Sequence, residues 1–259
     1  MSNVQINSLV LRNVQNAPET FFNEEAYLLV YPDVKNDIEA GSVSSALEDY
    51  KQYGLEEKRA GFFLGSNGND EITGIGEGTK IIAGVSLDTL LNGSPTTGVS
   101  EVDTLTGTEG QDIFLLGHPS LPGLTSISQQ FYVGGGDADY ALVKGFEKFD
   151  ISNLNLFDLL TNPNNVSGLL KDSILLEKSL DNYKIEEVKG NMEISTADED
   201  LVGIVEGVTS LMGFDIKVKD GVADVFDRKG MKWFSDVSLE DTFNIPFDDD
   251  FDGSFSVLV

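Results

Sequence analysis

Residues 65 to 115 repeat a nine-residue pattern of glycine, aspartate and one large apolar residue. Written in nines, the stretch is GSNGNDEIT (65–73), GIGEGTKII (74–82), AGVSLDTLL (83–91), six extra residues (92–97), GVSEVDTLT (98–106) and GTEGQDIFL (107–115). Position six holds Asp70, Thr79, Asp88, Asp103 and Asp112, and position eight holds Ile72, Ile81, Leu90, Leu105 and Phe114. Disordered linkers share this polar composition, but they do not keep an aspartate and an apolar residue two apart at a fixed period. The segment is therefore predicted to be ordered.

Such a repeat predicts stacked coils, each made of a six-residue turn and a three-residue strand. Glycine permits the backbone angles of the turn, and the apolar residue at position eight points inward. The aspartate at position six points into the turn, where carboxylate and carbonyl oxygens of adjacent coils meet. Because Ca²⁺ takes six to eight oxygen ligands, the pattern predicts a calcium site in which ion binding and folding are coupled.

The charge and the residue types narrow the function further. The chain has 44 acidic and 17 basic side chains, for a net charge of −27. This balance argues against a nucleic-acid partner; it fits cation binding, and solubility alone explains it equally well. The absence of cysteine excludes disulfides, zinc–thiolate sites and cysteine nucleophiles. The N-terminal residues show no secretion-signal pattern, and no stretch approaches the roughly 18 apolar residues of a membrane span.

Outside the repeat, the sequence predicts helices first and strands later. Apolar spacing in residues 20–62 indicates short helices, with a start at Asn23 and an interruption at Pro32. This helical unit is small, so we expect it to pack on later parts of the chain. Residues 131–146 contain a glycine–aspartate turn followed by a strand. Residues 183–208 alternate as a meander of strands joined by turns.

The chain resembles the RTX (repeat-in-toxin) family of calcium-binding β-roll proteins. The resemblance rests on GSNGNDEIT, GVSEVDTLT and GTEGQDIFL, and on YVGGGDADYALVKGF and EDLVGIVEGV, which look like the strands that cap RTX repeats. The segment YLLVYPDVKNDIEAGSVSSALEDYKQYGLEEKRAG is similar to a helical module found beside such repeats in bacterial proteins. The resemblance implies a mainly β fold with a small α-helical N-terminal module. Its centre would be a short calcium-binding β-roll, or parallel β-solenoid, capped by antiparallel strands.

The resemblance places calcium in the turns, and the metal ligands that it implies are Gly65, Asn67, Gly68, Asp70, Asp88, Asp103, Gly107, Gly110, Asp112 and Asp139. In the family's roll, the turns on one edge come from alternate repeats. The expected pairs are therefore Asp70 with Asp88 and Asp88 with Asp112, whereas Thr79 weakens the pair with Asp103. The chain departs from the family pattern at Glu77, Ser86 and Glu101, which replace the glycine at position four. The insertion at 92–97 leaves the later register open.

Four segments are expected along the chain. They are an N-terminal strand and helical module (1–62), the RTX-like roll (63–142), a β-rich cap (143–216) and an acidic tail (217–259). The resemblance suggests a C-terminal type I secretion signal in the last five residues, FSVLV, which a plain terminal strand fits equally well. DDDFDG (248–253) matches the start of an EF-hand loop but lacks its closing glutamate, so an acidic tail is the preferred interpretation. Residues 154–171 fit a loop or a short helix.

The sequence therefore predicts a secreted or cell-surface, non-enzymatic calcium-binding protein with a structural or surface-interaction role. Its expected partners are calcium ions, with a cell-surface molecule or a second copy of the chain. No zinc-protease, nucleophile-elbow or phosphate-loop motif occurs. Three alternatives remain open: a calcium-free relative of the family, an RTX-borne glycosidase or lyase, and a strand-exchanging subunit that donates VQINSLVL (4–11).

Overall fold

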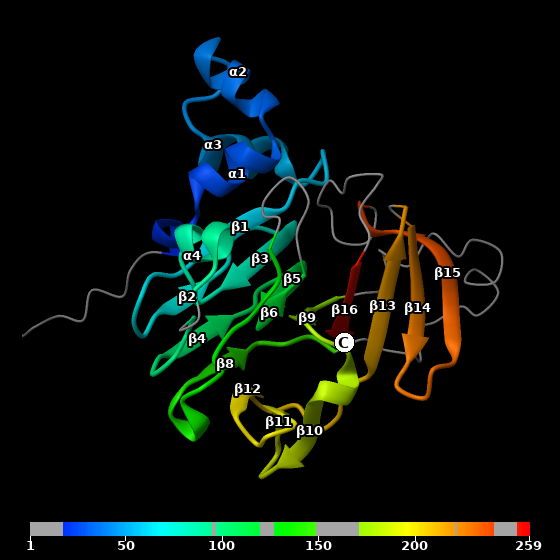
Figure 1. Ribbon diagram of the computed structural model, residues 1–259. Helices are drawn as coiled ribbons and strands as arrows, with labels where there is room; N and C mark the ends of the chain where they lie inside the picture. The colour runs from blue at the N-terminus through cyan, green and yellow to red at the C-terminus, as the bar shows by residue number, and fades with distance from the viewer. Residues whose placement is uncertain (1–17, 95–96, 120–126, 149–170, 221, 241–252) are drawn as a thin grey trace, which may run out of the picture.

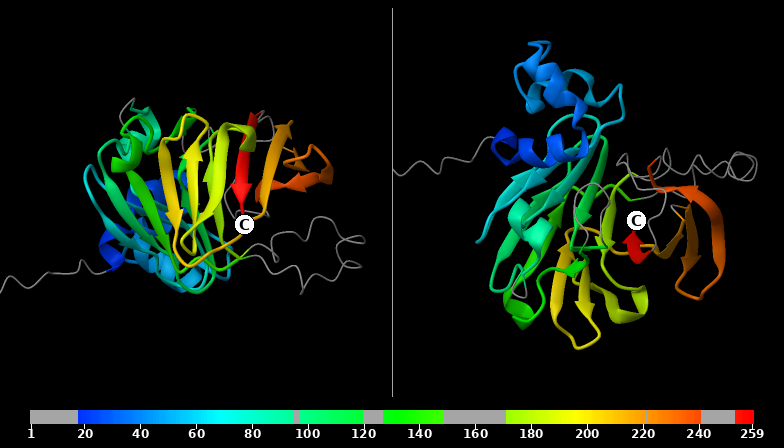
Figure 2. Two further views of the ribbon diagram at one scale, coloured as in Figure 1. Left: turned by 90° about the horizontal axis from the view of Figure 1, so that it is seen from below. Right: turned by 45° about the horizontal axis from the view of Figure 1, so that its top comes forward.

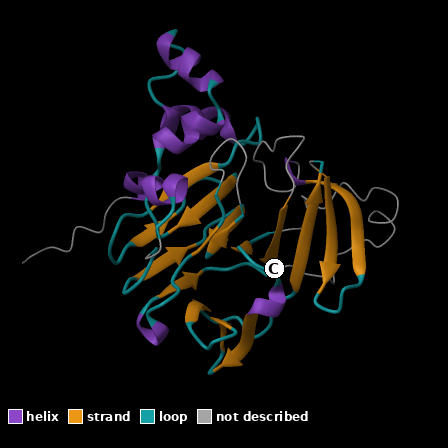
Figure 3. Cartoon of the chain, in the orientation of Figure 1, coloured by secondary structure: helices purple, strands orange, loops and turns teal. Residues whose placement is uncertain are grey.

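The computed structural model describes residues 18–94, 97–119, 127–148, 171–220, 222–240 and 253–259, which form a mainly β protein with a few short helices (Figures 1 and 3). The helical elements are η1 (Pro18–Phe21), α1 (Glu24–Val30), α2 (Asp33–Glu39), α3 (Ala46–Asp49), η2 (Tyr50–Gly54), α4 (Leu87–Asn92), η3 (Gly136–Ala138) and η5 (Leu180–Asn182). The predictions for residues 4–11, for 154–170 and for 248–252 lie outside the described residues.

Two mixed, open sheets contain most of the strands. Sheet A has the order β1-β3-β5-β9-β16-β13-β14-β15. Its strands are β1 (Gly61–Leu64), β3 (Thr79–Ala83), β5 (Gln111–Leu115), β9 (Ser173–Leu176), β16 (Gly253–Leu258), β13 (Gly213–Lys219), β14 (Val222–Asp227) and β15 (Lys232–Ser238). Sheet B has the order β10-β11-β12-β8-β4-β2. Its strands are β10 (Tyr183–Val188), β11 (Asn191–Thr196), β12 (Leu201–Val205), β8 (Tyr140–Lys144), β4 (Val102–Thr106) and β2 (Glu71–Thr73), and a small pair joins β6 (Gly117–His118) to β7 (Gln129–Gln130).

Parallel pairing is confined to the neighbourhood of the repeat. Strands β1, β3, β5 and β9 of sheet A are parallel, as are β2, β4, β8 and β12 of sheet B. From β1 to β5, successive strands alternate between the two sheets. All other pairs in the two sheets are antiparallel, including the predicted meander β10-β11-β12. A mainly β fold with antiparallel strands beside the repeat is therefore confirmed.

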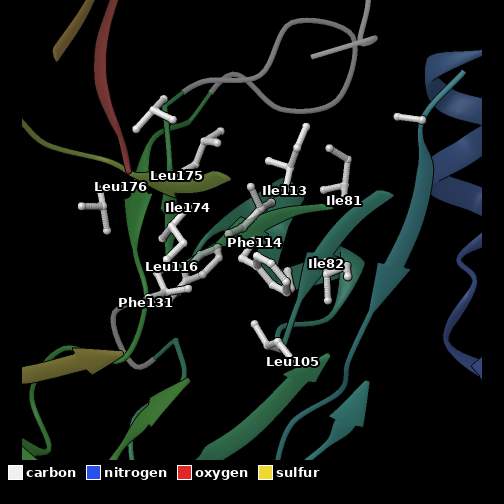
Figure 4. Packing of buried hydrophobic residues seen from close by; sticks show 14 of the residues in the cluster. Ile81, Ile82, Leu105, Ile113, Phe114, Leu116, Phe131, Ile174, Leu175 and Leu176 are labelled. Atoms are coloured by element: carbon white, nitrogen blue, oxygen red, sulfur yellow. The ribbon is translucent and has the colours of Figure 1, made fainter. Parts of the chain in front are cut away.

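The core between the two sheets is built by the apolar residues of the repeat. Ile82 and Phe114 of sheet A point toward Leu105 of sheet B, and all three are fully buried (Figure 4). Ile82 lies opposite Phe114, so it takes the inward place that the repeat predicted for Ile81. Ile81 is buried against the other face, opposite Ile113. Burial on both faces is the usual state of parallel strands, and it explains their continuous apolar runs.

The helical module lies against the β1 side of sheet A (Figure 2), and aromatic rings make the contact. Its first helix begins where predicted, because the Asn23 side chain accepts the amide of Ala26 at 2.8 Å. The rings of Phe22 and Tyr50 lie 5.7 Å and 6.1 Å from that of Phe63 on β1. This contact fits the expectation that the helical unit packs on later parts of the chain. Among the described residues, no helix is both long and apolar enough to cross a lipid bilayer.

The C-terminal residues are part of sheet A. Strand β16 lies between β9 and β13, with Phe255 and Val257 buried. The structure therefore shows a terminal strand, one of the two interpretations left open for FSVLV, where the acidic tail was predicted to end; β13 pairs with Gly253–Leu258 on one side and β9 with Ser256–Leu258 on the other. The predicted segment boundaries after residues 62, 142 and 216 fall inside β1, β8 and β13, so sheet pairing joins the predicted segments.

Replacing Phe63 by alanine should undock the helical module from sheet A. Deleting a buried phenylalanine costs about 3–5 kcal/mol, and here the aromatic contacts with Phe22 and Tyr50 disappear as well. Urea unfolding should show this loss. The matched control is Tyr53→Ala, because Tyr53 is 40% exposed and its removal should change stability by about 0.5 kcal/mol or less. Equal effects of the two substitutions would contradict this account.

Candidate metal site: carboxylates at the sheet edges

Two of the aspartates at position six of the repeat, Asp70 and Asp112, close their own turns. The Oδ2 atom of Asp70 accepts the amide of Ser66 at 2.7 Å. Asp112 accepts the amide of Thr108 at the same distance. In each case the donor lies four residues earlier, at position two. The aspartate therefore orders the turn by satisfying a backbone donor that no strand pairs.

The glycines of these turns leave room for the carboxylates. A Cβ atom on Gly65 would lie 2.8 Å from Oδ2 of Asp70, and one on Gly107 would lie 2.9 Å from Oδ2 of Asp112. Gly68 and Gly110, both at position four, have φ angles of +115° and +97°, which only glycine adopts readily. Asn67 lies exposed in the first turn.

A row of carboxylates lies at the N-terminal ends of the parallel strands of sheet B; we call it the sheet-B edge, formed by Asp70, Glu101, Asp103, Asp139 and Asp200. Asp103 is fully buried; its Oδ1 accepts the amide of Asp70 at 2.8 Å, and its Oδ2 accepts the Tyr132 hydroxyl at 2.6 Å. Burial raises the pKa of Asp103 to about 6, and the charges of Asp70 and Glu101 act in the same direction. Glu101, one of the departures from the pattern, accepts the amide of Gly68 at 2.8 Å.

Asp139 and Asp200 form the other part of the sheet-B edge. The Oδ2 of Asp139 accepts the amide of Ser100 at 3.2 Å, and Asp200 accepts the amide of Gly134. The Oδ1 atom of each carboxylate is buried without a hydrogen-bond partner. Burial raises the pKa of Asp139, and the charge of Asp200 raises it further. No carboxylate of the sheet-B edge forms an ion pair with a described lysine or arginine.

A second row lies at the corresponding ends of β3, β5 and β9; we call it the sheet-A edge, formed by Lys80, Asp112 and Asp172. All three side chains are fully buried. The Lys80 Nζ atom lies 3.4 Å from Oδ1 of Asp112. Asp172 accepts the amides of Asp112 at 2.9 Å and of Glu147 at 2.7 Å. Burial raises the pKa of Asp112 to about 6 and that of Asp172 to about 7.

Asp88 belongs to neither edge, so the predicted pairs of Asp70 and Asp112 with Asp88 are wrong. The expected third coil is helix α4, whose N-cap Ser86 accepts the amide of Thr89 at 3.2 Å. Asp88 is exposed on this helix and accepts the side-chain amide of Asn92. With this coil removed from the stack, GVSEVDTLT follows GSNGNDEIT on the same edge. The observed neighbours are Asp70 with Asp103 and Asp112 with Asp172.

Four residues of the two edges were not predicted as site residues: Lys80, Glu101, Asp172 and Asp200. The triplet Asp172-Ser173-Ile174 repeats the aspartate-x-apolar pattern outside the repeat region, so that pattern could have found Asp172. Lys80 follows the substituted Thr79, and Asp200 lies in a turn before β12; neither carries a local signal.

Calcium fits the two edges unequally. The described residues contain no group of three or more His, Cys, Asp or Glu side chains able to hold a metal ion. At Asp139 and Asp200, however, two buried carboxylate oxygens have neither a hydrogen-bond partner nor an ion pair with a described residue, whereas Oδ1 of Asp112, which also lacks a hydrogen bond, lies 3.4 Å from Nζ of Lys80. At the sheet-A edge a lysine already supplies the positive charge, so calcium does not fit there.

Without metal, the protein should lose stability as the pH rises from about 4 to about 7. The pKa of Asp172 rises from 3.8 to about 7 on folding, so the folded state holds a proton that the unfolded state releases. This contribution is complete below pH 3.8 and is lost as the pH passes 7; at about 1.4 kcal/mol per pKa unit it reaches a few kcal/mol. Urea unfolding in chelator between pH 4 and 8 measures it. Asp172→Asn should make the profile less steep, with the raised pKa values of Asp103 and Asp112 accounting for the slope that remains, whereas Asp88→Asn should leave it unchanged; equal slopes in all three proteins would contradict the assignment.

Comparison with known proteins adds no relative: no family model, no curated protein and no solved structure matches this chain.

Proposed function

We propose that this chain is a secreted, RTX-like calcium-binding protein with a structural or surface-interaction role and no catalytic activity. In this proposal the parallel strands form a short β-roll, and the antiparallel strands on both sheets cap it. The alternation of successive strands between two sheets supports the roll, as do the aspartates that close its turns.

The unpartnered oxygens of Asp139 and Asp200 are the observation that carries the calcium proposal. These two carboxylates would hold the ion. The charge of Asp200 already raises the pKa of Asp139, so the two carboxylates interact electrostatically. Bound calcium would supply two positive charges at the sheet-B edge, where no carboxylate forms an ion pair with a described lysine or arginine. Its role would be to remove carboxylate repulsion and hold the turns before β8 and β12 together.

The sparse ligand set predicts weak binding. Ca²⁺ takes six to eight oxygens, so backbone carbonyls and water would complete a site with two carboxylates. Sites of low charge and incomplete protein ligation belong to the extracellular range, with dissociation constants of about 10⁻⁴–10⁻³ M. Such a site would stay filled outside the cell and empty inside it. Weak binding would therefore be consistent with the proposed extracellular or cell-surface location.

Calcium should raise the melting temperature of chelator-treated protein. At a free concentration of about 100 times the dissociation constant, one site adds about 2.7 kcal/mol. Asp139→Asn and Asp200→Asn should each remove most of this gain, because each removes one of the two unpaired charges. Asp88→Asn is the control and should keep the full gain.

Calorimetric titration of the same four proteins gives the affinity directly. Mg²⁺ should stabilise less than Ca²⁺, because it demands a tighter octahedral shell and dehydrates reluctantly. Identical melting curves with excess calcium and with excess chelator would refute the proposed function.

A further inference from the structure

Lys80 is a basic side chain in an unusual place. Its side chain is 0% exposed, and it lies on β3 directly opposite Asp112 of β5, whose side chain is also 0% exposed. Lysine is almost never fully buried unless its charge is paired and its donors are satisfied. The groups around this ammonium therefore need to be identified, because they must satisfy its charge and its donors.

The ammonium group is surrounded by oxygen atoms from two neighbouring turns. It donates to the carbonyl oxygens of Gly76 at 3.1 Å and Gly78 at 3.0 Å in one turn, and to that of Glu109 in the next. Oδ1 of Asp112 lies 3.4 Å away and supplies the negative charge. Three carbonyl acceptors satisfy the three donors of an ammonium group. Backbone carbonyls combined with a carboxylate are also the ligands of a hard metal ion.

Register and space put the lysine in this position. The repeat would align Thr79 with Asp112, since both occupy position six, but the strands pair with a shift of one residue and bring Lys80 opposite instead. The lysine stem passes over Gly74, where a Cβ atom would lie 2.6 Å from the Cδ atom of Lys80. Three features therefore allow Lys80 to reach this site: the threonine at position six, the one-residue shift in pairing, and the glycine beneath the lysine stem.

We infer that Lys80 is the resident cation of the sheet-A edge: its ammonium group joins the turns at 74–79 and 107–112 in place of a metal ion. This edge therefore closes without added metal. Where the proposed function holds, calcium acts at the sheet-B edge and not at the sheet-A edge. The inference about Lys80 does not depend on the proposed function, because it concerns an edge that needs no calcium.

Amine labelling of the wild-type protein tests this inference without any substitution. In chelator, Lys80 should stay unlabelled by an acylating reagent for as long as the protein stays folded, whereas Lys51, with a side chain 42% exposed, should react at once. Hydrogen exchange followed by mass spectrometry should show β3 and β5 equally protected in calcium and in chelator. Labelling of Lys80 at the rate of Lys51, or loss of protection in β3 and β5 on chelation, would overturn the inference.

Substitutions of Lys80 then distinguish the contribution of its positive charge from that of its aliphatic stem. Lys80→Met keeps most of the stem but removes the charge and the donors, and it should raise the equilibrium constant for unfolding by about a hundredfold or more. Lys80→Ala also empties the oxygen-lined space, so millimolar Ca²⁺ should restore part of its lost melting temperature. Ca²⁺ should not rescue Lys80→Met, because the methionine side chain fills the space.

Both substitutions are made in an Asp139→Asn background, which removes the proposed sheet-B site. A calcium response in the alanine variant then comes from the sheet-A edge, even if wild-type protein shows no response and the proposed function fails. Equal stability of wild type and Lys80→Met would overturn the inference, as would the same calcium response in both variants. If neither variant folds, the labelling and exchange results on wild-type protein decide.

Discussion

The parallel strands depend on carboxylates that are buried where the strands begin. Asp103 accepts the amide of Asp70, and Asp172 accepts the amide of Asp112, so each carboxylate ties one coil to the next at a place beyond the strand ladder. Each buried carboxylate nevertheless loses the hydration of its negative charge. This burial is the main cause of the raised pKa values of Asp103, Asp112, Asp139 and Asp172. Hydrogen bonds alone do not offset that loss, so each group needs a proton, a basic side chain or a metal ion.

The two edges of the stack meet this requirement in different ways. At the sheet-A edge, Lys80 brings a positive charge within 3.4 Å of Asp112. At the sheet-B edge the described residues supply no lysine or arginine in an ion pair, so under the proposed function protons and metal ions would compete for the same oxygens. Acid conditions would neutralise Asp103 and Asp139 and make a metal ion less necessary there. At neutral pH and above the carboxylates ionise, their repulsion grows, and a divalent cation has most effect.

Local patterns in the sequence predicted the parts of the fold that depend on local physics. The repeat marked the turns and the strands that follow Asp70 and Asp112, and Asn23 marked a helix start. The pattern failed where two local signals competed, because Ser86 and the leucines after it form a capped helix instead of a third coil. It also could not show that Lys80 lies opposite Asp112, since strand register depends on packing between neighbouring strands. The place of β16 depends on pairing with distant segments, and a local acidic composition concealed it.

Under the proposed function, the difference between the edges would also determine which parts of the molecule depend on ions. The helical module docks on β1, and β16 and β13 extend the sheet from β9, so both additions are attached to sheet A. Sheet A holds its own cation in Lys80, and its parallel strands are buried on both faces around Ile81 and Ile82. Sheet B receives the meander β10-β12 next to Asp139 and Asp200, where two buried oxygens have no partner. Calcium binding would therefore stabilise the junction between the repeat and the meander β10-β12. Sheet A would hold the helical module and strand β16 without calcium.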